Sequence, residues 1–504
     1  MNQEILINVE LQEKRVAIIE GRTLEEFYVE RQGAQRLVGN IYKGVVDSIV
    51  PAIGALFVNI GLEKNGFLYA QDLTLPDYEK MAELIDRPST EGVGPNGRTK
   101  SQHIDIKEMF KVGQELMVQL VKEPLSTKGA RLTPHVSLPG RFLVLMPGAH
   151  HVGISRRIQD NKERARLKEL LKSIKLPAQG GLIVRTAGFG ATRREFLQDL
   201  HYLTNLWRRI KLAYQKKSTP GLIHEEYDLV LRTVRDSVTV QTARLLVDSK
   251  TEYKNIIYFL SAVAPHLRNR IHYYGADVPL FERRGVEDEI TKIFERKAAL
   301  PSGGHIMIEP TEALVAIDVN SGKFTRKKDP EETAYQVNLE AAREIARQVR
   351  LRDMGGIIII DFIDMKFASH RQSVLAALSE ALKRDHHAKT DISTISELGL
   401  VQMTRQRVRK SLESVAYQTC PYCQGKGLVK SPATLAIIAL RRIKKIFQRS
   451  KKRTILVQAH PDVASYLVNE NRQTIATLEG TFKAKILIKQ DVSIHMEDVT
   501  IETV

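Results

Sequence analysis

Two apolar runs, EALVAIDVNSG at residues 312–322 and GGIIIIDFIDM at residues 355–365, decide the expected fold of this chain. Each run has the length and β-branched content of a buried strand. The residues between them, about 331–352, are expected to form a helix, and a second helix is expected to run on to about residue 383. Strand-helix-strand order of this kind predicts a layered α/β domain.

Both strands end in an aspartate, Asp318 and Asp361. Burying an unpaired carboxylate costs several kcal/mol unless a partner or a metal compensates. If the strands are neighbours, the two carboxylates converge with Asn320 into an all-oxygen set suited to Mg²⁺ or Mn²⁺. The alternative is structural: residues 320–322 form a turn and Asp361 caps the next element. Asp364 is expected on the opposite strand face, with no catalytic role.

The chain of 504 residues is strongly basic. Its 76 Lys and Arg residues against 59 Asp and Glu residues leave a formal charge of +17, which suits a polyanionic partner. A hydrophobic content of 43% excludes a disordered chain, and the length predicts roughly three or four domains. No apolar run approaches the roughly 20 residues of a membrane span, and no signal peptide is visible. We therefore expect a cytoplasmic protein that binds nucleic acid.

The first part of the chain is expected to be rich in β-structure. Alternating apolar and polar residues over 14–30 predict two strands joined by a turn at 21–22. Glycine-punctuated β runs between residues 39 and 70, with a further strand ending at residue 123, predict a small barrel. A Pro/Gly/Ser-rich loop at 88–100 is inserted in it. Phe57 and Phe67 either stack on single-stranded bases or fill the barrel core.

Past residue 141 strand and helix candidates alternate, with a charged helix across 156–175 and helices from about 193 to 272. The strand GGLIVRTAG carries Arg185 and Thr186, a guanidinium and a hydroxyl that suit a terminal phosphate. Many strands end in this way without binding anything. From residue 432 a helix, a strand, a helix at 462–474 and a strand predict a separate small domain.

The two cysteines of the chain lie together, as Cys420 and Cys423. Two thiolates on a turn make half of a tetrahedral zinc site, and the glycines that follow let backbone amides approach the sulfur atoms. No second Cys-x-x-Cys follows, so a zinc ion needs further ligands from another copy of the chain. A redox dithiol and a pair of inert thiols are the alternatives.

Basic residues concentrate in two tracts near the end of the chain. Arg405, Arg407, Arg409 and Lys410 lie within six positions, and residues 414–461 hold ten Lys or Arg and no Asp or Glu. Eight of those ten fall in the expected helix at 441–453. Such tracts favour sequence-independent contacts with phosphates, and a solvated helix face is the alternative.

In chain order, these motifs resemble the ribonuclease E/G family of bacterial endoribonucleases. The matching stretches are NIYKG, FVNIGLEKNGFL, STKGARLT, GGLIVRTAG, LPSGG, EALVAIDVNSG, NLEAAREIARQVRLRDMGGIIIIDFIDM and CPYCQGKG. The resemblance covers almost the whole chain. No long Arg/Pro-rich tail follows the small domain, so the chain is expected to be most similar to the G branch of the family.

The resemblance implies a multidomain protein of α/β and β parts. The implied layout is an RNase H-like first part at 1–38, an OB-fold barrel of the S1 type at 39–129, a 5′-sensor and RNase H-like region at 130–220, a helical RNase H-like second part at 221–295, a DNase-I-like α/β catalytic domain at 296–415, a zinc link at 416–430 and a small α/β domain at 431–504. The loop at 88–100 and the basic helix depart from the family pattern.

The resemblance also implies the residues of each site. Asp318 and Asp361 would hold Mg²⁺ or Mn²⁺ with Asn320 as the supporting amide. Cys420 and Cys423 would share Zn²⁺ between two chains. The 5′-monophosphate sensor would consist of Gly140, Val144, Arg185 and Thr186, and the barrel would contact RNA through Phe57, Phe67, Lys122 and Lys128.

The implied activity is Mg²⁺-dependent cleavage of single-stranded, A/U-rich RNA inside the strand, in rRNA and tRNA processing and mRNA decay. Cleavage would be stimulated by a 5′-monophosphate and would leave 5′-phosphate and 3′-hydroxyl ends. A homodimer joined through the shared zinc is expected, with pairing of dimers left open. The alternatives are a non-catalytic RNA-binding or ribosome-associated protein and a DNA nuclease of DNase-I-like architecture.

Overall fold

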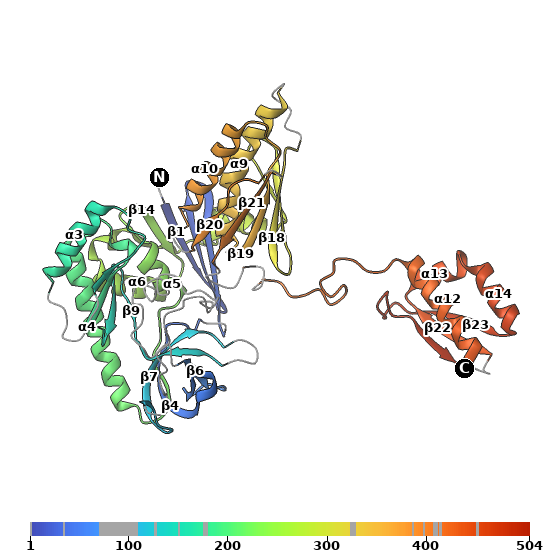
Figure 1. Cartoon of the computed structure of the whole chain (residues 1–504), viewed down its shortest axis with the longest axis horizontal. Coiled ribbons are helices and arrows are strands. Elements are labelled where there is room, and N and C mark those ends of the chain that lie inside the picture. Colours follow the sequence, from blue (N-terminus) through green and yellow to red (C-terminus); the bar gives the residue numbers. More distant parts are fainter. Residues whose placement is uncertain are drawn as a thin grey trace. The chain divides into compact units, whose positions relative to one another are not determined.

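The computed structural model describes residues 3–33, 36–69, 109–124, 129–149, 152–174, 180–322, 329–385, 388–396, 399–406, 412, 416–449 and 453–504. They form two compact units, Met1–Val415 and Ala416–Val504. Figure 1 labels their helices and strands. Within the described ranges, no helix is long and apolar enough to cross a membrane.

A five-stranded mixed sheet opens the N-terminal unit, with the order β15-β14-β1-β2-β3. Strand β1 runs parallel to β14 and antiparallel to β2. Its Ile5 and Ile7 pack toward α5 and α6, whereas Leu6 packs toward α7 and α8. This sheet therefore lies between two helical layers. Its strands are β1 (Gln3–Val9), β2 (Glu13–Glu20), β3 (Thr23–Arg31), β14 (Thr242–Val247) and β15 (Ile271–Tyr273).

Helices are expected from about residue 193 to 272 and in the segment 221–295, and α4 to α8 lie there, but three strands that were not predicted lie there as well. Three strands, β13 (Gly221–His224), β14 and β15, alternate with the helices there. Each is at most six residues long, and β14 pairs with β1 from the start of the chain. A short strand with a distant partner leaves no local periodicity that separates it from a helix.

Five strands of the next sheet close into a barrel. The order is β4-β5-β6-β8-β7, and a further pairing of β7 with β4 completes the ring. Leu56, Val58 and Leu68 alternate along their strands and fill its core. The predicted barrel is confirmed, but its last strand lies beyond residue 129, and the loop at 88–100 lies outside the described residues. The strands are β4 (Ile41–Val50), β5 (Ala55–Asn59), β6 (Gly66–Tyr69), β7 (Glu115–Lys122) and β8 (Arg131–Thr133).

A four-stranded sheet of order β11-β12-β10-β9 follows the barrel. Helix α4 packs on it, with Phe196 and Leu203 against Leu143 and Val184. A reciprocal cap between Thr192 and Glu195 sets the start of α4. The strands are β9 (Leu138–Pro139), β10 (Leu143–Pro147), β11 (Val152–Ile154) and β12 (Gly180–Val184).

The layered α/β domain predicted from the two apolar runs is confirmed. Its sheet has the order β16-β17-β18-β19-β21-β20, and α9 and α10 cover one face of it (Figure 1). Asp329 caps α9 and Pro330 occupies its first turn, as helix starts favour. The strands are β16 (Lys297–Ala299), β17 (His305–Pro310), β18 (Leu314–Asn320), β19 (Gly356–Asp361), β20 (Thr390–Ile392) and β21 (Leu400–Arg405).

The helices of the N-terminal unit account for its remaining layers. They are α3 (Asn161–Lys172), α4 (Arg193–Lys216), α5 (Leu229–Ser237), α6 (Lys250–Val263), α7 (Leu280–Arg283), α8 (Val286–Ile293), α9 (Pro330–Leu351) and α10 (Ala368–Leu382).

The C-terminal unit is a small α/β domain with its own core, as predicted. Its sheet has the order β23-β22-β24, with parallel pairing of β22 and β23. The expected helix at 462–474 is instead two helices that break near Asn471, and the described part of the basic helix runs to Arg449. The elements are α12 (Pro432–Arg449), β22 (Thr454–Ala459), α13 (Pro461–Asn469), α14 (Arg472–Phe482), β23 (Lys485–Gln490) and β24 (Thr500–Thr503).

Arg405 is not part of a phosphate-binding tract, contrary to the expectation from its basic neighbours. Its guanidinium is buried and lies 2.8 Å from carboxylate oxygens of both Asp385 and Asp353. Asp353 follows α9 and Asp385 follows α10, so the ion pairs hold both helix ends to β21. The expected phosphate contacts Arg407, Arg409 and Lys410 lie outside the described residues.

Replacing Asp385 with alanine should destabilise the layered domain, because it leaves the buried guanidinium of Arg405 without one of its carboxylates. Removing one partner of a buried ion pair costs about 3–5 kcal/mol. Scanning calorimetry of the full chain should show the transition of this domain at a lower temperature. Glu380→Ala, which removes the partner of the exposed Lys383, should change it little. Equal shifts for the two variants would contradict the role of the buried pair.

Candidate functional site

The two strand-end aspartates lie side by side. Strands β18 and β19 are parallel, and Asp318 pairs in register with Asp361. Residues in register on adjacent strands present their side chains to the same face of a sheet. The neighbours Ile317 and Ile360 point the other way, into the core beneath α9 and α10. Both carboxylates are therefore exposed on the face opposite the helices.

Asn320 supports this pair directly. Its side-chain Nδ2 donates a hydrogen bond of 2.7 Å to Oδ2 of Asp318. Two positions apart on one strand, the two residues share a face, which explains the contact. The amide thus orients the carboxylate of Asp318.

The pKa of Asp361 is raised above its ordinary value. Partial burial is the larger cause, and the negative charges of Asp318 and Asp364 add to it. The expected placement of Asp364 on the opposite strand face is wrong, because β19 ends at Asp361 and strand alternation stops there. Asp364 is exposed and close enough to act on Asp361, so a third carboxylate contributes to the charge of this site.

The donor set fits a hard divalent cation that keeps part of its water shell. Among the described residues no group of three or more His, Cys, Asp and Glu side chains is arranged to hold a metal ion. Mg²⁺ characteristically takes only one or two protein carboxylates and completes its octahedron with waters and substrate phosphates. Asp318 and Asp361 supply that number. A bound cation would relieve the repulsion from Asp318 and Asp364, which adds to the effect of burial on the pKa of Asp361.

His305 lies next to this site and was not predicted from the sequence. It lies on β17 opposite Asn320. Burial and the charge of Lys297 lower the pKa of His305, while the charge of Asp318 opposes that effect. The antiparallel pairing of β17 and β18 is the signal that places it there.

The barrel brings together three of the residues expected to contact RNA. Phe57 pairs in register with Phe67, Phe67 with Arg131, and Arg131 with Lys122, across β5, β6, β8 and β7. None of the four belongs to the barrel core, so the core interpretation is wrong for both phenylalanines, and their contact with bases stays a prediction. We call Phe57, Phe67, Arg131 and Lys122 the barrel row. Lys128 lies outside the described residues.

Arg131 and Tyr69 extend this surface and were not expected from the sequence. The ring of Tyr69 meets the ring of Phe67 edge to face with centroids 5.3 Å apart. The Arg131 guanidinium lies 5.4 Å from the centroid of Tyr69. Aromatic rings beside cations are the combination that binds single-stranded nucleic acid.

The expected sensor residues lie around β10 and β12. The Arg185 backbone N–H donates to Phe142 O, and its Nη1 donates to Gly140 O at 2.7 Å. The Thr186 hydroxyl lies 3.2 Å from that of Ser155. Val144 is buried on β10 between these residues. The structure therefore gathers all four predicted residues at the ends of two adjacent strands.

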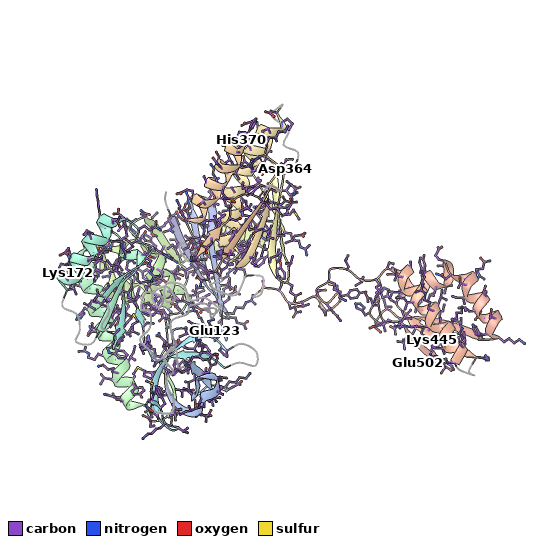
Figure 2. All side chains as sticks on the ribbon, viewed as in Figure 1. Glu123, Lys172, Asp364, His370, Lys445 and Glu502 are labelled. Atoms are coloured by element: carbon purple, nitrogen blue, oxygen red, sulfur yellow. The ribbon has the colours of Figure 1, made fainter. Side chains whose placement is uncertain are left out.

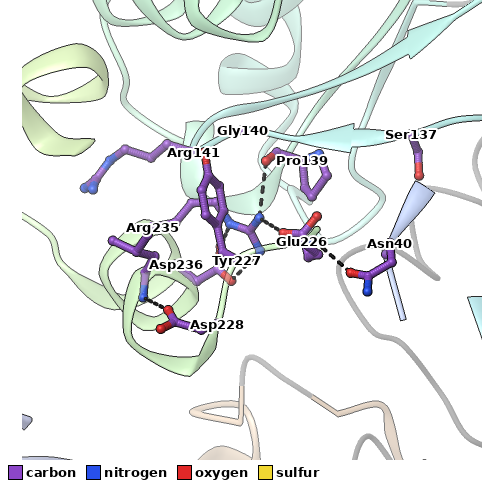
Figure 3. Close-up of polar contacts among 12 residues, drawn as sticks. Asn40, Ser137, Pro139, Gly140, Arg141, Glu226, Tyr227, Asp228, Arg235 and Asp236 are labelled. Carbon is purple, nitrogen blue, oxygen red and sulfur yellow. Dashed lines mark hydrogen bonds and ion pairs between the residues drawn. The ribbon is translucent and has the colours of Figure 1, made fainter. Parts of the chain in front are cut away.

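Asp236 was not predicted and holds the Arg185 guanidinium. Nη1 of Arg185 lies 2.7 Å from Oδ1 of Asp236, and Arg235 pairs with the same carboxylate. Burial opposes ionisation of Asp236, but the two guanidinium groups hold its pKa below the ordinary value. Figure 3 shows Arg235 reaching on to Pro139 O and to Glu226. This network fixes Arg185 from the side of α5.

The backbone at Gly140 leaves no room for a side chain. A Cβ atom there would lie 2.6 Å from both carboxylate oxygens of Asp199. That carboxylate is buried and accepts the backbone N–H groups of the three residues after Gly140, and burial raises its pKa. The turn into β10 is thereby held against α4, which positions the Gly140 carbonyl for Arg185.

Cys420 and Cys423 are free thiols on a turn, as expected. The Gly427 N–H donates to Cys423 Sγ at 3.3 Å, so an amide does approach the sulfur. The backbone N–H groups of Cys423 and Tyr422 and the Cys423 thiol lower the pKa of Cys420. A stabilised thiolate is the form that binds zinc. The ring of His495 packs against Tyr422 with centroids 4.1 Å apart and ties this turn to the small domain.

The basic residues of α12 form one face of the helix. Leu435, Ala439, Ile443 and Phe447 are buried on the opposite side. The exposed cations are Arg441, Arg442, Lys444, Lys445 and Arg449, and the described part of the chain places no acidic partner beside them. This arrangement fits a phosphate contact and a solvated face equally, so both interpretations stay open.

The chain is similar to known proteins, both to family models and to individual relatives. Residues 137–408 match the model of the Ribonuclease E/G family, and residues 419–504 match that of the RNase E/G, Thioredoxin-like domain. The chain is 39% identical over 497 residues to Ribonuclease G of Salmonella typhimurium, which covers 99% of this chain and 97% of the relative. Ribonuclease G of Haemophilus influenzae is 40% identical over 467 residues, or 93% and 92% of the two chains. Ribonuclease E of Haemophilus influenzae is 38% identical over 488 residues, which span 96% of this chain and 50% of the relative.

Cys420 should keep its reactivity toward iodoacetamide at lower pH than an ordinary thiol. Its pKa is lowered in the folded chain, so a larger thiolate fraction remains below the usual value of about 8.5. After metal is removed with a chelator, peptide mass spectrometry should show a smaller drop in the alkylation rate of Cys420 between pH 8.5 and pH 7 than in the urea-unfolded chain. Identical pH profiles in the two states would refute the local stabilisation.

Proposed function

This chain belongs to the ribonuclease E/G family, and from that premise we propose that it is a metal-dependent endoribonuclease that hydrolyses single-stranded, A/U-rich RNA. The family relationship supports an endoribonuclease in RNA processing. The observation that carries the finer proposal is the in-register pair of Asp318 and Asp361 on adjacent parallel strands. We assign the cut to that pair, with 5′-phosphate and 3′-hydroxyl products.

Asp318 and Asp361 would hold Mg²⁺ or Mn²⁺ between their carboxylates. When bound, such an ion lowers the pKa of a coordinated water and neutralises charge on the phosphate. The hydrogen bond from Asn320 keeps Asp318 in one orientation, so the donor set needs no rearrangement before the substrate arrives. The exposure of both carboxylates lets a phosphodiester approach from the open face of the sheet.

The barrel row would bind the RNA strand on the way to the cut. Phe57 and Phe67 offer faces for stacking of bases, and Arg131 and Lys122 offer charge for the backbone phosphates. Stacking contributes about 1–3 kcal/mol of binding free energy per base and tolerates any sequence, but the bases must be unpaired. Preference for single strands follows from that requirement.

A monophosphate at the 5′ end of the RNA would meet Arg185 and Thr186. The guanidinium is fixed by Asp236 and by the Gly140 carbonyl, so it would bind the phosphate without first losing conformational freedom. Asp236 and the Gly140 carbonyl already accept hydrogen bonds from the Arg185 guanidinium, so they compete with the phosphate for its N–H groups. We propose that a 5′-monophosphate bound there stimulates cleavage.

Sheet topology supports the expected domain layout. The order β3-β2-β1-β14-β15, with β2 and β3 antiparallel and β14 and β15 parallel to their neighbours, is consistent with an RNase H-like unit into which the barrel is inserted. We assign the barrel to the OB type and the β16–β21 sheet to a DNase-I-like catalytic domain on the same basis. The small domain is thioredoxin-like.

We further propose a homodimer joined by Zn²⁺. Cys420 and Cys423 supply only two of the four ligands of a structural zinc ion, and two copies of the chain supply four. The lowered pKa of Cys420 and the amide contact to Cys423 support zinc over inert thiols.

The test of the catalytic site is substitution of its carboxylates. Asp318→Asn and Asp361→Asn should each reduce cleavage of a labelled, 5′-monophosphorylated single-stranded RNA by more than about 100-fold, because even residues that only support metal ligands account for about 10- to 100-fold. Filter binding of the uncut RNA should persist. EDTA should abolish cleavage by the unaltered protein.

Glu309→Gln is the matched control, since Glu309 is an exposed acid on the neighbouring strand β17. It should cleave normally. Full activity of either aspartate variant would remove the site and favour a binding protein without catalysis. Cutting of duplex DNA instead of RNA would favour the DNA nuclease. The same RNA with a 5′-hydroxyl measures the contribution of the 5′ end.

Native mass spectrometry should reveal a dimer of full-length chains carrying one zinc ion. Removal of zinc with a chelator, or Cys423→Ser, should yield monomers, because the link then loses ligands. Thr477→Ala, a substitution at an exposed position on α14 of the same unit, should leave the dimer intact. A monomer that retains tightly bound zinc would overturn this assembly.

A further inference from the structure

The segment between Asp361 and α10 is fastened to α9 along its length. Asn338, fully buried in α9, donates to Ile363 O at 2.7 Å and accepts from Ile363 N at 3.1 Å. Glu331 accepts the N–H groups of Lys366 at 2.9 Å and Phe367 at 3.3 Å. Helix α10 begins directly after these two residues and has no side-chain cap, so Glu331 fixes the backbone that leads into the helix. These bonds hold the backbone of residues 363–367 in one conformation.

Three rings meet at the end of this segment, Tyr335, Phe367 and His370, which we call the aromatic cluster. Tyr335 and His370 are stacked, with centroids 4.2 Å apart and planes inclined by 16°. Phe367 meets His370 edge to face at 5.3 Å. Glu331 lies 2.9 Å from Nδ1 of His370 and fixes that ring as well. Phe367 nevertheless remains 56% exposed, so its ring is supported from one side and open to solvent on the other.

The topology places this cluster at the edge of the sheet that carries the carboxylates. Strand β18 leads into α9 and β19 leads into α10, so both strands end and both helices begin at one edge. Glu331 and Phe367 lie in those two helix starts, and Asp361 ends β19. Figure 2 shows Asp364 and His370 at the same end of this part of the molecule. In α/β sheets, ligands bind outside the carboxyl ends of the strands.

A single exposed apolar side chain is common on protein surfaces and needs no explanation. Phe367 differs because its backbone and its supporting ring are both hydrogen-bonded to Glu331. The exposed Lys366 beside it offers a positive charge, while the nearby side chains Asp361 and Asp364 are acidic. An aromatic face with one adjacent cation suits a nucleotide, whose base stacks and whose phosphate is anionic.

We propose that Phe367, supported by His370 and Tyr335, is a stacking surface for one nucleobase of the RNA strand next to the phosphate that is cut. The inference rests on the proposed function, because it assumes RNA at Asp318 and Asp361. It adds a second base contact, separate from the barrel row and built into the catalytic domain. Glu331 is a positioning residue that holds the ring toward the substrate.

Fluorescence of 2-aminopurine tests the contact without requiring cleavage. A set of A/U-rich, 5′-monophosphorylated RNAs, each with 2-aminopurine at one position, is bound to the Asp361→Asn chain. Stacking on Phe367 should quench the fluorescence at one position adjacent to the mapped cut. Adding Phe367→Ala or Phe367→Leu should abolish quenching at that position alone, whereas Phe367→Trp should keep it.

Catalysis by the otherwise unaltered chain gives a second readout. Phe367→Ala should lower kcat/KM for the RNA by roughly 5- to 150-fold, the range expected for loss of one stacked base. Phe367→Leu should lower it as well, because leucine keeps apolar volume but has no aromatic face. Glu331→Gln should lower it less, since an amide oxygen still accepts from the backbone. Tyr258→Ala removes an 80% exposed ring on α6 and is the matched control, with no change expected.

Quenching that survives Phe367→Ala, or equal losses from Tyr258→Ala, would overturn the stacking surface. The two proposals fail separately. If Asp318→Asn cleaves normally, the catalytic site is wrong, while the fluorescence profile still reports whether a base rests on Phe367. If cleavage depends on the aspartates but Phe367→Leu matches the unaltered chain in both assays, only the stacking surface is wrong.

Discussion

The in-register parallel pairing of β18 with β19 is the constraint on which the candidate active site depends. A slip of one residue would turn every side chain of β19 to the other face and carry Asp361 into the core. The register is held by Ile358 and Ile360, which are fully buried beneath α9 and α10. Hydrophobic packing on one face of the sheet thus places two charges on the other, where their repulsion favours a bound cation.

Buried ion pairs hold elements together in two parts of the N-terminal unit. Arg405 ties the ends of α9 and α10 to β21, and Arg235 with Asp236 fixes Arg185 beside β10. An unpaired buried charge is costly, so each of these cations has carboxylates beside it. The net charge of +17 therefore overstates how many cationic side chains are available to a substrate. Position in the fold, not the charge total, separates structural arginines from those available to RNA.

Aromatic rings outside the hydrophobic cores lie at two places that are built in different ways. In the barrel row, strand alternation sends Phe57 and Phe67 outward while Leu56 and Leu68 fill the core. In the aromatic cluster, hydrogen bonds from Glu331 fix Phe367 and His370. Both arrangements present a ring on a backbone that is already ordered. Little conformational entropy would then be lost in the base stacking that we propose, which suits the binding of unpaired bases.

The sequence by itself determined the layered domain, the barrel, the small domain and the residue types of each candidate site, because strand periodicity, strand-end aspartates and the Cys-x-x-Cys spacing are local signals. Four facts were decided only by the tertiary structure. Asp318 lies in register with Asp361, Arg131 lies in register with Phe67, Arg405 is buried, and β14 pairs with β1. Each of these depends on strand register or on partners distant along the chain. Local patterns record which residues favour a strand, but pairing between distant segments is set by the packing of the whole core.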